Sequence, residues 1–177
     1  ANLEPLIQSI PVAPLKLASL EGCRTLADQV NNYLVSFRHE SPTNVGQADS
    51  LQGYCADSYL LECECPRFGS GEGKGVLKES VRGCDLFIMV DVTNYSLTYR
   101  VNGYENHMSP DNHYQDLKRI ISAADGKARR INVIMPFLYE GRQHKRSKRE
   151  SLDCALMLQE LVDMGVSNIL TFDAHDP

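Results

Sequence analysis

The chain has 177 residues, of which 42% are hydrophobic and 23% charged, and its formal net charge is -5. A domain of this size buries roughly 70% of its unfolded surface, and the composition excludes intrinsic disorder, collagen and coiled coil. The longest apolar runs are far shorter than the roughly 20 residues of a membrane span. Residues 1–20 lack the basic start and apolar stretch of a signal peptide. We therefore expect a cytoplasmic protein without membrane or nucleic-acid partners.

The apolar residues change their period along the chain, which predicts alternating strands and helices. Strands are expected at residues 15–19, 59–65, 76–77, 86–92, 131–137 and 169–173. Helices are expected at residues 22–35, 110–124 and 152–164. Ser109-Pro110 is a typical helix start, and Gly165 a typical stop. Polar residues with Pro and Gly breakers occupy residues 36–57 and predict a loop or insertion.

Strands separated by helices predict an α/β fold with right-handed crossovers and a mainly parallel sheet. We expect residues 1–177 to form one domain. In such a sheet, ligands bind beyond the carboxyl ends of the strands. The loops that follow residues 137 and 173 are therefore the first places to look for a site.

Cysteine spacing fits neither a zinc site nor the disulfide framework of a small secreted protein. The six cysteines are Cys23, Cys55, Cys63, Cys65, Cys84 and Cys154. Cys63 and Cys65 lie on one face if this segment is a strand, and we expect these two to be buried or partly buried free thiols.

A cationic loop follows the strand expected at residues 131–137. Its cations, five in eight residues, are Arg142, Lys145, Arg146, Lys148 and Arg149. Guanidinium and ammonium groups form charge-assisted hydrogen bonds with phosphate, and the helix start that follows adds free N–H donors. The loop is thus a candidate site for a small anion, with a solvated basic turn as the alternative.

Two further segments carry candidate site residues. Asp173 and His175 lie on the same side of an extended chain, so they could share a divalent ion or its water shell, although a histidine there also fits a structural role. Phe68 and Glu72 lie in a glycine-rich segment that offers an aromatic face and a carboxylate to a base, or is an ordinary turn.

Three stretches together resemble one family, the ribose-phosphate pyrophosphokinases, or phosphoribosyl pyrophosphate synthetases. Residues 67–72 with 79–85 are similar to the family's R-F-S-D-G-E and E-S-V-R-G-x-D. Residues 135–150 resemble its I-P-Y-x-x-Y-A-R-Q-D and R-E-P-I, and residues 170–175 its L-T-L-D-L-H. Order and spacing agree from about residue 14 onward, with extra residues in 36–57 and 93–108. The resemblance covers the N-terminal half of such an enzyme.

This resemblance implies a phosphoribosyltransferase-like domain, a homo-oligomer (dimer or hexamer), and transfer of the diphosphoryl group of Mg-ATP to ribose 5-phosphate. By position, Phe68 and Glu72 would contact adenine in the site of a neighbouring subunit. Arg142 would stack on adenine as a catalytic and nucleotide-binding residue, with Gln143 hydrogen-bonding near it. His175 would be a catalytic magnesium ligand beside Asp173. The positions that match a regulatory phosphate or ADP site between subunits are Ser80, Arg82 and Arg149.

The sequence departs from the family pattern at two aspartates, which are replaced by Ser70 and His144. The ribose 5-phosphate loop belongs to the family's C-terminal half, so this polypeptide alone is expected to bind nucleotide weakly and to be inactive. The alternatives are a non-catalytic homologue that binds nucleotide or phosphate and regulates a synthetase, and an interaction domain that uses residues 36–57.

Overall fold

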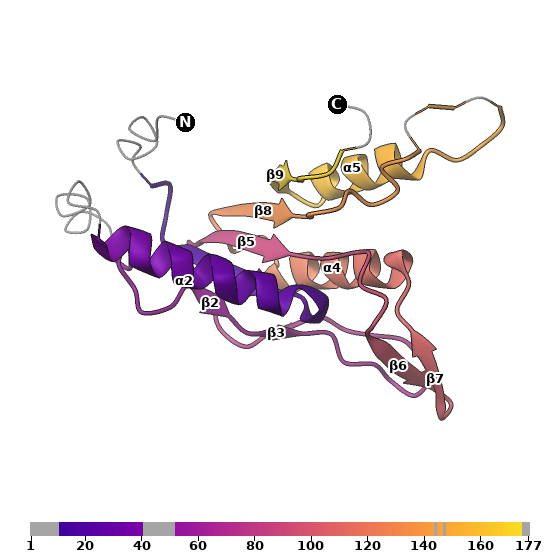
Figure 1. Cartoon of the computed structure of the whole chain (residues 1–177), viewed down its shortest axis with the longest axis horizontal. Coiled ribbons are helices and arrows are strands. Elements are labelled where there is room, and N and C mark those ends of the chain that lie inside the picture. The colour runs from indigo at the N-terminus through magenta and orange to yellow at the C-terminus, as the bar shows by residue number, and fades with distance from the viewer. Residues whose placement is uncertain (1–10, 41–51, 144, 147, 175–177) are drawn as a thin grey trace.

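The computed structural model describes residues 11–40, 52–143, 145–146 and 148–174. Its centre is a five-stranded sheet with the order β2-β1-β5-β8-β9 in which every pairing is parallel. The strands are β1 (Leu15–Ser19), β2 (Leu60–Leu61), β5 (Asp85–Met89), β8 (Arg130–Ile134) and β9 (Val166–Leu170). Their carboxyl ends point to one end of the molecule, the right-hand end of Figure 1.

Helices cover both faces of this sheet (Figure 1). One face packs against α2 (Arg24–Glu40), which follows the short 3-10 helix η1 (Glu21–Cys23). The opposite face packs against α4 (Pro110–Ala124) and α5 (Asp153–Asp163). Among the described residues, no helix has the length and apolar character needed to cross a bilayer.

The larger core lies between the sheet and helices α4 and α5. Alternate residues of the central strands point into it, among them Leu86, Ile88 and Val133, all with 0% exposure. Leu117 and Ile120 of α4 meet them from the helix side. The apolar stripe of α4 repeats at helical spacing, so its burial positions the loops at both of its ends.

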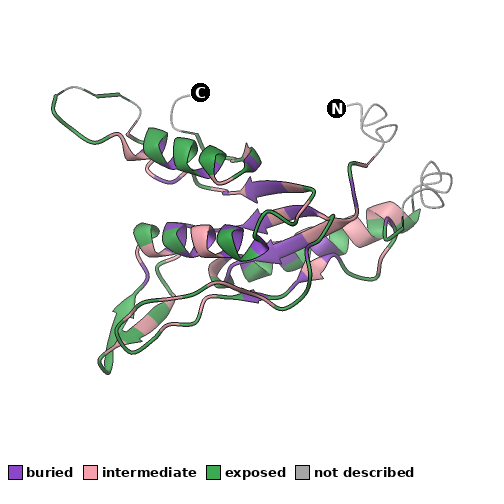
Figure 2. Ribbon diagram, turned by 180° about the vertical axis from the view of Figure 1, so that it is seen from behind, coloured by how far each residue is buried: buried purple, intermediate pink, exposed green. Residues whose placement is uncertain are grey.

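Two small antiparallel sheets extend from the body. In one, β3 (Cys63–Glu64) pairs with β4 (Val76–Leu77), and in the other β6 (Thr98–Val101) pairs with β7 (Tyr104–His107). The turn before β4 contacts α4 closely, because a Cβ on Gly75 would lie 2.4 Å from the carbonyl oxygen of Arg119. The β6–β7 hairpin projects from the body, and its outer strand is exposed along its whole length (Figure 2).

A ladder of polar side chains crosses three strands on the α2 face. Asp85 on β5 accepts from Arg130 Nε at 2.9 Å and from Asn132 Nδ2 at 2.8 Å, both on β8. Asn168 on β9 donates to Asn132 Oδ1 at 2.7 Å. The pairing of β8 with β9 shifts register here, since Ile131 faces Val166 whereas Asn132 faces Asn168.

The fold class is as the sequence predicts, an α/β domain with a parallel sheet between helices. The helix at 110–124 and the strand at 15–19 have the predicted bounds, and β4 confirms the short strand at 76–77. The strands expected at 86–92, 131–137 and 169–173 begin and end earlier. The helix expected at 152–164 covers 153–163.

Three expectations need correction. The helix expected at 22–35 runs to Glu40, so the first five residues of the expected polar insertion at 36–57 are helical. Residues 41–51 of that insertion lie outside the described part. The strand expected at 59–65 is two strands, β2 in the main sheet and β3 in a small one, because the chain leaves the main sheet after Leu61. Residues 98–107 form a hairpin that the sequence reading did not anticipate. All six cysteines are free, and Cys63 is buried and Cys65 partly buried, as expected for these two.

Candidate anion and nucleotide site

The loops after β8 and β9 lie side by side at the carboxyl end of the sheet. Phe137 and Asp173 form an isolated parallel bridge, and the carbonyl of Pro136 accepts from the backbone N–H groups of Phe172 and Asp173 at 3.1 and 3.2 Å. Asp173 is exposed there. The structure therefore brings the start of the basic loop next to the carboxylate that the sequence singles out.

The five cations of the basic loop are exposed, and none has an ion-pair partner within the described part of the chain. Figure 1 shows the loop extending beyond the sheet at the carboxyl end. Because like charges so close together repel, an anion that enters the loop gains favourable interactions with several groups at once. His144 lies outside the described residues.

Gln143 is held by two hydrogen bonds at the start of α5. Its Nε2 donates to Glu140 Oε2 at 2.9 Å, and its Oε1 accepts from the backbone N–H of Asp153 at 3.1 Å. Leu152, at the N-cap position of α5, makes no side-chain capping bond. Gln143 thus serves as the missing cap, and its amide keeps a second N–H donor and a second acceptor site beyond these two bonds.

An aromatic pair fixes the base of the basic loop to the two helices. The rings of Tyr114 on α4 and Tyr139 stack with centroids 4.7 Å apart. Tyr139 donates to Asp111 Oδ1 and Tyr114 to Glu160 Oε2. Burial, and then the acceptor carboxylate, raises the pKa of each phenol well above its usual value. Both phenols therefore stay protonated donors through neutral pH.

The glycine-rich turn after β3 presents Phe68 and Glu72 to solvent. Phe68 is 54% exposed, and its backbone N–H donates to the carbonyl of Glu72 at 2.7 Å. Ser70, which replaces the family's aspartate, donates its hydroxyl to Glu72 Oε2 at 2.9 Å. One carboxylate oxygen of Glu72 is thus occupied within its own turn, a contact that an aspartate could not donate in its ionised form.

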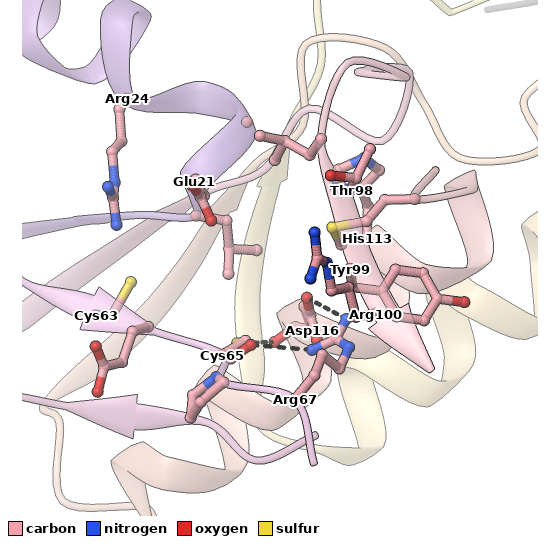
Figure 3. A pocket seen from close by; sticks show the side chains of 16 residues that line it. Glu21, Arg24, Cys63, Cys65, Arg67, Thr98, Tyr99, Arg100, His113 and Asp116 are labelled. Carbon is pink, nitrogen blue, oxygen red and sulfur yellow. Dashed lines mark hydrogen bonds and ion pairs between the residues drawn. The ribbon is translucent and has the colours of Figure 1, made fainter. Parts of the chain in front are cut away.

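A network behind this turn was missed by the sequence reading. Arg67 donates to Asp116 Oδ2 at 2.8 Å and to the carbonyl of Cys65 at 3.1 Å (Figure 3). Arg119 donates to Asp116 Oδ1 at 2.6 Å. Asp116 lies on the inward side of α4, beside Leu117 and Ile120. An aspartate within the apolar stripe of a predicted helix is the sequence signal that could have indicated this buried network.

The same network borders a pocket of about 430 Å³ between η1, β3 and the β6–β7 hairpin (Figure 3). Burial raises the pKa of the Cys63 thiol to about 11, and burial together with Asp116 raises that of Cys65 to about 12. These thiols are therefore protonated at neutral pH. Of the residues predicted for the site, none lines this pocket within the described part of the chain.

The remaining predicted site residues lie apart in one chain. Ser80 and Arg82 are exposed in the turn that precedes β5, at the amino end of the strand, whereas Arg149 follows β8 at the carboxyl end. Phe68 and Glu72 lie beside the hairpin, on the opposite flank of the sheet from β9 (Figure 1). His175 lies outside the described residues. One chain therefore brings together the basic loop and Asp173 but not the turn or the Ser80 group.

Magnesium is the metal to test at this edge. Within the described part of the chain, no three His, Cys, Asp or Glu side chains are grouped to enclose a metal ion. Mg²⁺ keeps several waters and commonly takes only one or two protein carboxylates together with substrate phosphates. The exposed carboxylate of Asp173 beside the basic loop offers one oxygen ligand of the kind that such an ion accepts.

Comparison with known proteins decides the family. The family model for the N-terminal domain of ribose phosphate pyrophosphokinase matches residues 15–165. The chain belongs to the ribose-phosphate pyrophosphokinase family. A ribose-phosphate pyrophosphokinase of Corynebacterium ammoniagenes is 30% identical over 165 residues, which are 92% of this chain and 41% of the relative. One from Oceanobacillus iheyensis is 27% identical over 121 residues, or 67% of this chain and 33% of the relative.

The fold agrees with that of a family member of known structure. The phosphoribosylpyrophosphate synthetase of Mycobacterium smegmatis superimposes with a TM-score of 0.63 at 22% identity, covering 92% of this chain and 43% of that protein. The chain spans about two fifths of the length of these pyrophosphokinases. The family model therefore shows the family of the chain, and the superposition shows its α/β fold.

Proposed function

We propose that this domain is the N-terminal, nucleotide-binding part of a ribose-phosphate diphosphokinase, which transfers the diphosphoryl group of Mg-ATP to ribose 5-phosphate. The observation that carries the proposal is the adjacency of the basic loop and Asp173 at the carboxyl end of the sheet, in a chain whose family carries out this reaction. A cation cluster beside a carboxylate suits a polyphosphate and its magnesium ion.

In this reaction the anomeric hydroxyl oxygen of the ribose attacks the β-phosphorus of ATP. The bond from that phosphorus to the oxygen shared with the α-phosphate breaks, AMP leaves, and the hydroxyl proton passes to solvent. Such a transfer needs chiefly positioning and charge stabilisation. Asp173 and His175 are the residues that would hold magnesium, and the ion would supply positive charge to the phosphate oxygens. Arg142 binds the nucleotide, and Gln143 holds the loop against α5.

The functional protein is proposed to be a homo-oligomer, a dimer or hexamer. Phe68 and Glu72 lie on the other flank of the sheet from the basic loop, so a neighbouring subunit has to supply them to the adenine. The same reasoning applies to the proposed regulatory anion site, because Ser80 and Arg82 lie at the other end of the sheet from Arg149. We propose that the protein acts in the cytoplasm.

The alternative, a regulatory homologue that binds nucleotide without catalysis, is favoured by two observations. Ser70 donates to one oxygen of Glu72, and the amide nitrogen and oxygen of Gln143 each make one hydrogen bond within the chain. An enzyme is expected to release these contacts when ATP binds, whereas a regulator does not need to.

Two measurements test these functions. The first tests nucleotide binding by the basic loop, which both functions require, and the second separates the enzyme from the regulator. In the 177-residue chain, Arg142→Ala is expected to weaken Mg-ATP binding by about 1.5 to 3 kcal/mol, the contribution of a hydrogen bond to a charged group. Calorimetry with Arg129→Ala, an exposed arginine outside the loop, is the control. Equal affinity of the two variants for Mg-ATP would show that the loop is a solvated basic turn.

In the full-length gene product that carries this domain, His175→Ala is expected to lower the formation of phosphoribosyl pyrophosphate at least about tenfold, or roughly 1.4 kcal/mol. Wild-type protein that binds Mg-ATP yet forms no product with saturating ribose 5-phosphate would establish the regulator instead.

A further inference from the structure

The β6–β7 hairpin is the element of the fold that the function has not used. Residues 98–107 contribute nothing to the buried cores, and the sequence reading places them in a stretch that exceeds the family pattern. A two-stranded hairpin by itself is at best marginally stable in water. The hairpin therefore depends on its contacts with the rest of the chain, and these contacts indicate its role.

Those contacts converge on the turn that carries Phe68 and Glu72. The backbone N–H of Asn102, at the hairpin tip, donates to the carbonyl of Gly69 at 3.0 Å. Val101 packs so closely on the turn that a Cβ added to Gly71 would lie 2.8 Å from Val101 Cγ2. Gly71 has a φ of +90°, a conformation that other residues rarely adopt.

The hairpin also reaches the ion-pair network below the turn. The guanidinium carbon of Arg67 lies 5.5 Å from the centroid of the Tyr99 ring, within the range of a cation–π contact. Tyr99 and Val101 share one face of β6 and are half-buried, whereas Thr98 and Arg100 on the other face are exposed. One side of β6 thus follows the turn from its base at Arg67 to its tip.

We infer that the β6–β7 hairpin is a positioning element that holds the turn of residues 67–73 in its nucleotide-binding shape, with Tyr99 and Val101 as positioning residues. The turn is long and glycine-rich, and its own hydrogen bonds are few. They are the Phe68 N–H to the Glu72 carbonyl, the Gly71 N–H to the Phe68 carbonyl and the Ser70 hydroxyl to Glu72 Oε2. The hairpin closes it from one side while the Arg67–Asp116 pair anchors it from below. This inference rests on the proposed function for its link to ATP.

The test compares two matched substitutions in β6. Val101→Ala removes the contact with Gly71, whereas Thr98→Ala trims a β-branched residue on the opposite face of the same strand. In the 177-residue chain, amide hydrogen exchange at Phe68 and Gly71 is expected to accelerate at least about tenfold in Val101→Ala and to stay within about twofold in Thr98→Ala. Mg-ATP affinity is then measured by calorimetry for wild type and both variants in the full-length oligomeric protein, because the proposed function places the turn at the nucleotide of a neighbouring subunit.

A second variant replaces residues 98–107 by an Asn-Gly turn between Leu97 and Met108, which already share a backbone hydrogen bond of 2.8 Å. Because the deleted residues lie outside the cores, unchanged far-ultraviolet circular dichroism and melting temperature are expected, with exchange at the turn accelerated further. Unchanged exchange at Phe68 and Gly71 in a folded deletion variant would overturn the inference.

The two readouts separate the inference from the proposed function. Faster exchange with weaker Mg-ATP binding supports both. If exchange accelerates while wild type and variants bind Mg-ATP equally, the hairpin still orders the turn, but the turn does not contact the nucleotide and that part of the proposed function fails. If the wild type binds no Mg-ATP, the exchange data alone decide whether the hairpin orders the turn.

Discussion

Removing the carboxylate of Asp116 leaves the buried guanidinium of Arg67 without its anionic partner. The side chains of Asp116 and Arg67 are 7% and 10% exposed, and Arg119 is 21% exposed. In Asp116→Ala, Arg119 can turn to solvent, whereas Arg67 keeps only the carbonyl of Cys65 and the ring of Tyr99. Breaking a buried pair costs about 3 to 5 kcal/mol. Because only one cation is left unpaired, we expect the free energy of unfolding to fall by an amount near the lower limit, about 3 kcal/mol.

Urea denaturation followed by circular dichroism measures this loss. With an m-value of about 2 kcal/mol per molar, the midpoint should fall by about 1.5 M, and the melting temperature by about 6 to 12 °C. The control is Glu64→Ala, which removes an exposed ion pair with Lys78 on the neighbouring small sheet. That change should cost at most about 1 kcal/mol.

A compensating variant identifies the cause. Arg67→Met combined with Asp116→Leu removes both charges and keeps apolar volume, so much of the lost stability should return. If Asp116→Ala loses no more stability than Glu64→Ala, the network is screened by solvent and the reasoning from burial is wrong.

Three further predictions concern acid, thiols and the core. Hydrogen bonds from Lys118 and then from Tyr114 hold the pKa of Glu160 below its ordinary 4.5. The stability that these bonds provide is complete above pH 4.5 and is lost as the pH falls through the lower pKa of the folded state. Glu160→Gln should therefore show a shallower loss of melting temperature below pH 4.5. Iodoacetamide at pH near 8 should label exposed Cys55 before Cys63, whose burial raises its pKa to about 11; equal rates by mass spectrometry would contradict the burial. Leu117→Ala, at a fully buried position, should cost about 2 to 5 kcal/mol in urea denaturation, and a loss below about 1 kcal/mol would mean that α4 packs loosely.

The sequence is a good guide where a local signal and a buried face agree. Helix α4 has the predicted bounds because Ser109 accepts from the backbone N–H of Asn112 at its start. At its end Asp125 adopts a left-handed conformation, with a φ of 49°. Between these caps, the apolar stripe of α4 packs on the sheet, as its helical spacing predicts. The basic loop and Asp173 could be placed together for a similar reason, since parallel strands share one carboxyl edge.

Prediction fails where a tertiary contact overrides local polarity. Residues 36–40 read as loop, yet they continue α2, and there the guanidinium of Arg38 lies 4.2 Å from the ring centroid of Tyr54 and 4.9 Å from that of Tyr59. Both tyrosines come from a segment more than a dozen residues away, which a local pattern does not register. The division of residues 59–65 between two sheets is likewise decided by distant partners, namely β1 and β4.

The hairpin at 98–107 did carry a signal. Asn102 and Gly103, with φ values of 49° and 86°, form the two-residue turn, and Asn-Gly is the strongest short-range indication of a hairpin. The flanking residues lack alternating apolar character, because only one face of β6 packs on the chain and β7 is exposed throughout. Its contact with the turn of residues 67–73 could not be predicted from the local sequence.

The polar ladder from Asp85 to Asn168 has a consequence for how the strands align. Parallel strands buried on both faces are apolar on both, and a slide of two residues keeps every side chain on its own face, so hydrophobic burial discriminates poorly against it. Such a slide would separate Asn132 from Asp85, which are joined at 2.8 Å. The register shift brings Asn168 opposite Asn132, and their hydrogen bond fixes the alignment of the edge strand β9 in the same way. Replacing both asparagines by leucine should therefore leave a sheet that still buries its faces but no longer has a single alignment of β8 and β9, and the adjacency of Phe137 and Asp173 would be lost with it.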